Sequence, residues 1–157
     1  MPDRSSFARP RLLIVGCGDV GMRMLPLLAA KYRVFALTSQ PERRAELRAL
    51  GAVPVVADLD RPATLARLRG IAPWVLHLAP PQPDGEHDRR TRHLVAALGE
   101  ARRMVYVSTS GVYGDCGGAL VHEHRPVAPR NARARRRVDA ERILRAWALA
   151  TGASLSI

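Results

Sequence analysis

Short apolar runs alternate with amphipathic segments along the whole chain. The predicted strands cover residues 11–16, 33–38, 52–57, 74–79, 103–109 and 153–157. The predicted helices cover residues 19–31, 41–50, 62–69, 87–101 and 132–150. The strands are apolar on both faces, which is typical of a sheet that is covered on both sides. The alternation therefore predicts an α/β fold, a doubly wound parallel sheet of about six strands with helices on both faces.

Two segments rich in proline and glycine interrupt this alternation. Residues 79–88 follow the fourth predicted strand, and residues 111–131 follow the fifth. Both would lie beyond the carboxyl ends of their strands, which is where open α/β sheets bind ligands. We therefore expect the functional site at this edge of the sheet.

The length and composition fit one domain of a soluble intracellular protein. A chain of 157 residues is long enough for one hydrophobic core, so we expect residues 11–157 to form the domain and residues 1–10 a flexible segment. No apolar run is long enough to cross a bilayer, and the N-terminus lacks the apolar stretch of a secretory signal. Two cysteines, Cys17 and Cys116, form no CxxC pair. These features predict a cytoplasmic protein without a membrane partner.

The formal net charge of +11 favours anionic partners of any kind. Nucleic-acid binding needs basic residues clustered on one surface beside a docking motif. Here the arginines are scattered from Arg4 to Arg145, and aromatic residues are few. A nucleic-acid-binding protein is therefore the least favoured interpretation of the charge.

A glycine-rich motif joins the first predicted strand to the first predicted helix. It reads Gly16-x-Gly18-x-x-Gly21. The first glycine permits a tight turn, the second lets a pyrophosphate approach the backbone, and the third allows close packing of helix on strand. The N-terminus of the helix supplies N–H donors and the positive end of its dipole. Because both flanking elements are present, the motif predicts a dinucleotide site in a Rossmann-type fold.

Residues after the second strand bear on the choice of cofactor. A free ribose 2′-hydroxyl usually meets Asp or Glu there, but this chain has Thr38 and Ser39, with Arg43 and Arg44 nearby. Arginines would pair with a 2′-phosphate, so NADP is slightly favoured over NAD. The alternative is that both arginines are solvated on a helix surface. Asp58, after the third strand, is expected at the adenine edge.

Beyond this loop, the chain resembles the extended short-chain dehydrogenase/reductase superfamily, in its NAD-dependent epimerase/dehydratase branch. The matching segments are GCGDVG at 16–21, ADL at 57–59, LHLAPP at 76–81, VYVSTSGVYGD at 105–115 and DAERIL at 139–144. GxGxxG in place of the more usual GxxGxxG indicates an atypical member. The motifs and the resemblance together imply a cofactor site at the glycine loop and the strand ends. Its expected residues are Gly16, Cys17, Gly18, Asp19, Val20, Gly21, Thr38, Ser39, Arg43, Asp58, Leu59, Leu78, Ala79, Pro80 and Ser108.

The resemblance also implies a catalytic set of Ser/Thr, Tyr and Lys. Thr109 matches the hydroxyl residue. The family's YxxxK motif ends four residues before the helix glutamate, here Glu141, which assigns Arg137 to the lysine and Arg133 to the tyrosine. The spacing of Ala140, Leu144 and Trp147 continues back to both arginines, and this predicts one inward stripe. Arg136 is a rival for the inward position, and a fully solvated arginine face is the other alternative.

Arginine remains protonated at neutral pH and cannot act as a conventional general acid or base. Tyr113, after the fifth strand, is one candidate replacement, and His122 and His124 are others because histidine carries protons near neutral pH. The expected catalytic group is Thr109, Tyr113, Arg133 and Arg137. We predict no metal site, since the two loop histidines and Cys116 match no strong motif. His77 is expected to be a core residue, and Cys17 to serve packing rather than reactivity.

Three interpretations follow. The first is an NAD(P)-binding oxidoreductase or sugar-nucleotide epimerase relative that lacks the Tyr/Lys pair. The second is a non-catalytic dinucleotide-binding or sensor module, and the third is the nucleic-acid binder. Family members continue well beyond a sixth strand, so we expect the substrate-binding part to be largely absent and the small-molecule substrate stays open. An open apolar sheet edge would permit a homo-oligomer.

Overall fold

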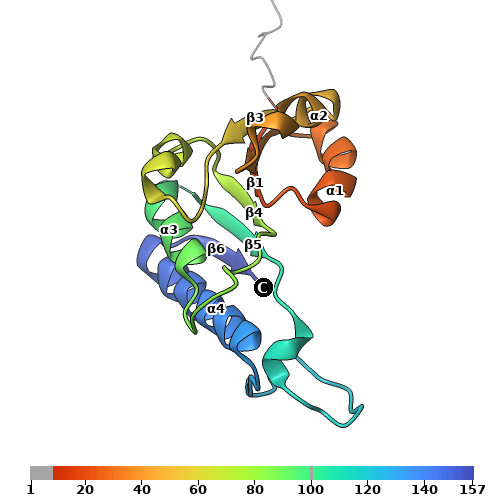
Figure 1. The fold of residues 1–157 in the computed structure, drawn as a ribbon, viewed down its shortest axis with the longest axis vertical. Coiled ribbons are helices and arrows are strands. Elements are labelled where there is room, and N and C mark those ends of the chain that lie inside the picture. The colour runs from red at the N-terminus through yellow and green to blue at the C-terminus, as the bar shows by residue number, and fades with distance from the viewer. Residues whose placement is uncertain (1–8, 100) are drawn as a thin grey trace, which may run out of the picture.

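A computed structural model describes residues 9–99 and 101–157 of the chain. Its centre is a six-stranded parallel sheet with the order β3-β2-β1-β4-β5-β6 (Figure 1). The strands are β1 (Arg11–Val15), β2 (Arg33–Thr38), β3 (Val53–Val56), β4 (Trp74–His77), β5 (Arg103–Tyr106) and β6 (Ser154–Ser156). The predicted doubly wound sheet is confirmed. The flexible segment expected at residues 1–10 lies, except for Arg9 and Pro10, outside the described residues.

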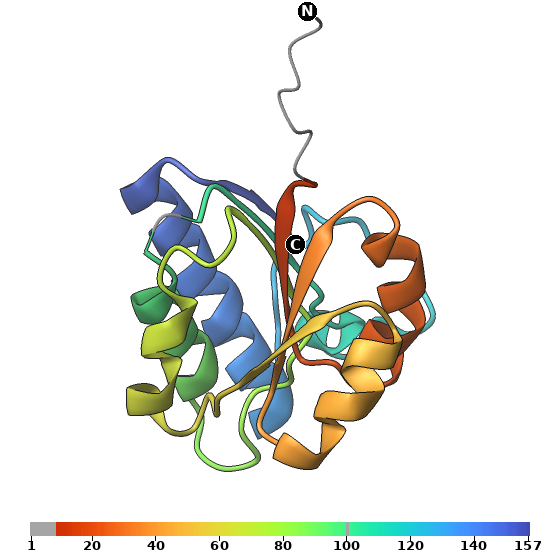
Figure 2. The ribbon, with the colours of Figure 1, turned by 90° about the horizontal axis from the view of Figure 1, so that it is seen from above.

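Helical segments connect the strands and cover both faces of the sheet. The α-helices are α1 (Asp19–Ala29), α2 (Arg44–Ala49), α3 (Arg89–Leu98) and α4 (Ala132–Thr151), and the 3₁₀ segments are η1 (Pro41–Arg43), η2 (Pro62–Leu68) and η3 (Ser110–Tyr113). In Figure 2, α1 and α2 cover one face of the sheet, while η2, α3 and α4 cover the other. Each face therefore buries its own apolar core.

The topology places β1 at the centre of the sheet. Val15, its last residue, pairs with Leu37 of β2 on one side and with His77 of β4 on the other. The chain runs outward from β1 to β3, then returns to β4 and runs outward to β6. The order of strands reverses between β1 and β4, and this switch point is where such sheets bind ligands.

Two predicted helices differ in kind from the expectation. Residues 62–68 form a 3₁₀ segment, and the segment after β2 begins as 3₁₀ before it becomes α2. Both begin with proline. In the first, the Thr64 hydroxyl accepts from Asp58 N at 2.9 Å and donates to Arg61 O at 2.7 Å, which holds a tight turn that does not extend into an α-helix. Among the described residues, no helix is long and apolar enough to span a membrane.

Candidate cofactor-binding site

Two of the three loop glycines are required by the fold itself. Gly16 has φ +95°, and a Cβ there would lie 2.5 Å from Ala79 N. A Cβ on Gly21 would lie 2.9 Å from Gly16 O. The glycine loop thus packs against Ala79, just beyond the end of β4, on one side and against the first turn of α1 on the other.

Gly18 has a different environment. It is exposed, and a Cβ built on it meets nothing within 4 Å. It is also the N-cap residue of α1 and has no side chain to occupy the helix N-terminus. The first N–H groups of a helix have no acceptor within the helix. The structure therefore leaves an open approach to these donors, with Asp19 and Val20 exposed beside it.

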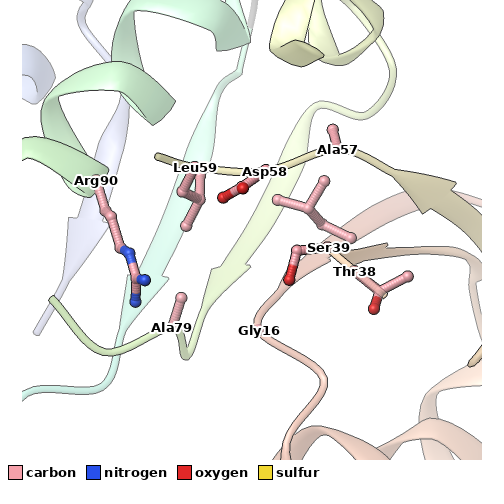
Figure 3. A pocket seen from close by; sticks show the side chains of 9 residues that line it. Gly16, Thr38, Ser39, Ala57, Asp58, Leu59, Ala79 and Arg90 are labelled. Carbon is pink, nitrogen blue, oxygen red and sulfur yellow. The ribbon is translucent and has the colours of Figure 1, made fainter. Parts of the chain in front are cut away.

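A pocket lies next to this loop at the carboxyl edge of the sheet (Figure 3). It is lined by Gly16, Leu37, Thr38, Ser39, Ala57, Asp58, Leu59, Ala79 and Arg90. Six of these were predicted from the sequence: Gly16, Thr38, Ser39, Asp58, Leu59 and Ala79. Leu37, Ala57 and Arg90 were not. The walls come from the glycine loop, from residues at and just after the ends of β2, β3 and β4, and from the first turn of α3. This position fits a dinucleotide half that starts at the glycine loop.

Arg43 holds the glycine loop from the side of β2. Its Nη1 donates to Cys17 O at 2.7 Å, and its Nε lies 3.0 Å from Glu46 Oε2. The side chain is therefore bound to the protein and is not simply solvated on a helix surface. Its positive charge follows Thr38 and Ser39 by a few residues in the chain, after the end of β2.

Cys17 is a packing residue. Its side chain is 3% exposed, and burial raises the pKa of the thiol to about 11, although Arg43 acts in the opposite direction. The position of Cys17 at the start of α1, which would tend to lower the pKa of a thiol, does not offset the effect of burial. A thiol that stays protonated at neutral pH is a poor nucleophile, so the expectation of packing over reactivity is confirmed.

Three hydroxyl residues follow β5, and they differ in their partners. Ser108 donates to Glu141 Oε1 of α4 at 2.6 Å, and the Thr109 hydroxyl caps η3 by accepting from Gly111 N at 3.3 Å. Tyr113 is half-buried at the end of η3. The structure therefore places Ser108, Thr109 and Tyr113 along one connection beyond β5, with Ser108 tied to α4.

The arginines of α4 do not form the stripe that the spacing predicts. Arg137 is buried at 8% exposure and continues the inward face of Ala140 and Leu144. Arg133 is exposed, so the expectation that it faces inward is wrong. The buried face of α4 is wider than one stripe and includes Arg136 at 6% exposure, but it does not include Arg133 in the first turn.

Arg137 belongs to a buried network under the sheet edge. Its Nη1 donates to the Tyr106 hydroxyl at 2.9 Å and to Val107 O at 3.0 Å. The Tyr106 ring packs on His77, whose Nε2 lies 2.9 Å from the Thr91 hydroxyl. Burial, together with the smaller effect of the positive charge of Arg137, lowers the pKa of His77 to about 3. His77 is therefore a neutral core residue, as expected.

Tyr106 is not suited to the role of the tyrosine that the resemblance implies. It has a guanidinium beside its hydroxyl, as the family's pair would have an ammonium. However, the side chain is 1% exposed, and burial raises its pKa to about 12 despite Arg137. A phenol with this pKa, closed off from solvent, cannot exchange protons with a substrate.

Two further arginines of α4 hold the loop after β4. Arg135 pairs with Glu86 at 3.0 Å, and Arg136 donates to Gly85 O. Asp139 accepts from Asp88 N at 2.8 Å. These contacts fix residues 85–88 against the start of the helix, which gives the arginine-rich segment a structural role that the sequence pattern did not indicate.

The loop histidines lie apart from these groups. His122 and His124 are exposed on the connection between η3 and α4. In the part of the chain that the structure describes, no three His, Cys, Asp or Glu side chains gather in a way that would hold a metal ion.

The family model for NAD(P)H-binding proteins matches residues 16–150, from the first loop glycine to the last turn of α4. The chain belongs to the NAD(P)H-binding family. The match includes the glycine loop, every wall of the pocket and the arginine helix. NAD(P) binding and the Rossmann-type fold are thereby confirmed, and the choice between NAD and NADP is not decided by this match.

Solved structures share the fold of this family member. A functionally unknown conserved protein from Silicibacter pomeroyi DSS is 28% identical with a TM-score of 0.67, over 87% of this chain and 48% of that chain. A short-chain dehydrogenase/reductase superfamily protein from Agrobacterium tumefaciens with bound NAD is 22% identical with a TM-score of 0.77, over 92% and 47%. A Thermus thermophilus UDP-glucose 4-epimerase in complex with NAD is 22% identical with a TM-score of 0.77, over 92% and 53%.

These neighbours confirm the expected likeness to short-chain dehydrogenases and epimerases at the level of the fold. The chain spans about half the length of each of them. A search of curated proteins gave no match.

Proposed function

We propose that the protein binds NADP(H) in preference to NAD(H), and that it has given up the tyrosine-dependent hydride-transfer chemistry of related dehydrogenases and epimerases. The proposal rests on the contrast between the two halves of the site, the cofactor-binding half and the half where catalysis is expected. The glycine loop and pocket have the shape that a dinucleotide needs, whereas α4 offers one exposed and one buried arginine at the positions of the catalytic pair.

The residues present fit the cofactor. The free N–H groups at the start of α1 suit the pyrophosphate, because Gly18 leaves the approach open. Thr38 and Ser39 suit the adenosine ribose, and Asp58 suits the base. When bound, a nicotinamide ring supplies hydride chemistry. The chain itself supplies binding and orientation at these atoms.

Arg43 supports the preference for NADP(H). It is the first cation after the end of β2 along the chain, and its carboxylate partner Glu46 is half exposed. A 2′-phosphate would compete with Glu46 for the guanidinium. No carboxylate among Thr38, Ser39 and Gln40 would repel that phosphate.

Calorimetric titration with NADPH and NADH tests this proposal. We expect tighter binding of NADPH. Gly18→Asp should abolish binding of both while the protein stays folded, because the new side chain has room in the free protein but places a carboxylate at the pyrophosphate site. Arg43→Ala should weaken NADPH by about tenfold or more and NADH much less. The proposed preference for NADP(H) would be wrong if the wild-type protein bound NADPH and NADH with equal affinity and Arg43→Ala left both affinities unchanged.

A catalytic oxidoreductase remains the second candidate, and the observation that favours it is Tyr113. This half-buried tyrosine lies at the end of η3, beyond the carboxyl end of β5. We expect no NADPH oxidation with small carbonyl compounds or nucleotide sugars by the wild-type protein. Turnover that Tyr113→Phe abolishes, and that His122→Gln does not affect, would favour this candidate over the non-catalytic one.

A further inference from the structure

Arg90 is the cation in the pocket that no motif predicts. It lies in the first turn of α3, and Figure 3 shows its guanidinium beside Leu59 and Ala79, across the pocket from Thr38 and Ser39. Its side chain is 24% exposed, so most of it is covered by the protein. The pocket thus has a cationic wall at the end away from β2.

Three hydrogen bonds fix the position of this guanidinium. Nε and Nη2 donate to the two carboxylate oxygens of Asp60 at 2.9 and 2.6 Å, and Nη1 donates to Pro80 O at 3.2 Å. The two-pronged contact sets the plane of the guanidinium as well as its place. The hydrogen bond from Arg90 lowers the pKa of Asp60, so the pair is ionised at neutral pH. Arg90 is therefore a rigid wall of the pocket.

The surroundings of Arg90 suit a flat heterocycle better than a phosphate. Its charge is already balanced by Asp60, while the N–H donors of the glycine loop lie at the start of α1 and are not engaged by any side chain cap. The pocket walls near Arg90 are the apolar side chains of Leu59 and Ala79. A guanidinium held in one plane still attracts an aromatic face, and it is weakly hydrated enough to stack on one.

We infer that Arg90, held by Asp60, contacts the adenine base of the dinucleotide and gives the site its selectivity for a purine. The inference rests on the proposed function, because it needs a dinucleotide in this pocket. It assigns the base end of the cofactor to α3 and to the connection after β3. These segments lie outside both the glycine loop and the arginine helix.

The test compares the affinities of ADP and UDP, which share a diphosphate and ribose and differ in the base. Each nucleotide competes with NADPH in a fluorescence displacement assay. For the wild-type protein we expect ADP to bind better than UDP. Arg90→Ala should weaken ADP and NADPH by about tenfold and leave UDP nearly unchanged, so that the selectivity for ADP falls. Arg90→Lys should also lose selectivity, since a lysine keeps the charge without the flat guanidinium.

Arg89→Ala is the matched control. Arg89 is the neighbouring residue on the same helix, pairs with Asp84 at 3.1 Å, and does not line the pocket. The Arg89→Ala variant should bind ADP and UDP with the same affinities as the wild type. Asp60→Asn keeps Arg90 and weakens its anchor, so it should reduce the selectivity for ADP less than Arg90→Ala. If Arg90→Ala fails to fold, the selectivity of Asp60→Asn for ADP over UDP tests the inference in its place.

The outcomes separate the two proposals. If the folded wild type binds neither NADPH nor ADP, the proposed function fails. If it binds NADPH and the Arg90 variants lose ADP and UDP equally, Arg90 serves the phosphates and the inference is overturned. If the Arg90 variants bind every ligand as the wild type does, the inference is overturned and the proposed function stands.

Discussion

The three loop glycines lack a side chain for different physical reasons. At Gly16 the backbone is in the left-handed region, and the next element along the sheet edge presses on it. At Gly21 the helix packs on the loop. At Gly18 the fold has room for a side chain, and only a ligand at the helix N-terminus would require its absence. Stability and cofactor affinity can therefore be separated within one motif.

We expect Gly16→Ala to lower the free energy of unfolding by about 2–3 kcal/mol, because a Cβ there is strained by the positive φ and collides with the backbone of Ala79. Gly18→Ala should change it by less than about 0.5 kcal/mol and still weaken NADPH binding. Denaturant unfolding and calorimetry measure the two effects. Equal loss of stability in both variants would contradict this division.

His77 makes the stability depend on pH. Its ordinary pKa is 6.5 and the folded value is about 3, so between these values the unfolded chain binds a proton that the folded chain does not. Stability should therefore fall as pH decreases below 6.5, by about 1.4 kcal/mol per pH unit from this group. Denaturant unfolding at about pH 7 and about pH 5 measures the slope. We expect His77→Gln to flatten it and the exposed control His122→Gln to leave it unchanged.

At the scale of elements, α4 shows how far periodicity can be used. Helical spacing correctly places Arg137 with Ala140 and Leu144, but it also predicts an inward Arg133, which is exposed. Periodicity gives a direction around the helix axis. It does not say where along the axis the neighbouring layer ends, and Arg133 lies in the first turn of the helix.

Sequence patterns report on neighbouring residues and not on tertiary packing, and this explains which parts of the site could be predicted. Each of the six strands and the glycine loop could be located from local pattern, because apolar runs and glycine spacing are properties of adjacent residues. Arg90 could not, since its position in the pocket depends on Asp60, a partner 30 residues away that approaches only after β3 and α3 have packed. The ties between α4 and residues 85–88 are likewise products of tertiary structure.

The two arginines at the expected catalytic positions should differ in their effect on stability. Arg137→Ala removes the partner of the Tyr106 hydroxyl and leaves a void beneath the sheet edge, so we expect a loss of about 2–4 kcal/mol. Arg133→Ala, four residues earlier on the same helix, should change stability by less than about 0.5 kcal/mol. Thermal and denaturant unfolding check this. Similar losses from both would mean that Arg133 packs against the protein in solution.

At the scale of the whole molecule, the net charge is +11, and basic residues occur in the helices on both faces of the sheet, such as Arg23 in α1 and Arg142 in α4. Many arginines already have carboxylate partners, among them Arg23, Arg43, Arg89, Arg90, Arg135 and Arg145. The charge therefore raises the general attraction for anions and does not mark one docking surface. This favours a small polyanionic cofactor over a nucleic acid.

The salt dependence of the affinity distinguishes binding of a nucleic acid from binding of the cofactor. Association with duplex DNA that rests on scattered charge should disappear as salt rises from about 50 to about 200 mM. NADPH affinity should change by less than about tenfold over that range, because the pocket adds hydrogen bonds and apolar contacts to the charge. Filter binding and calorimetry give the two slopes. DNA binding that persists at the higher salt would revive the nucleic-acid interpretation.

The central place of β1 has a consequence for synthesis on the ribosome. Its partner β2 follows soon after it, but its other edge is covered only by β4, whose last residue is His77. A nascent chain that ends before β4 carries an open edge on a strand whose residues 12–15 are all buried in the finished fold. We expect this half-sheet to be the stage most in need of chaperones. The pocket takes walls from both sides of that edge, so competence to bind the cofactor arises late, after the chain has closed over its own first strand.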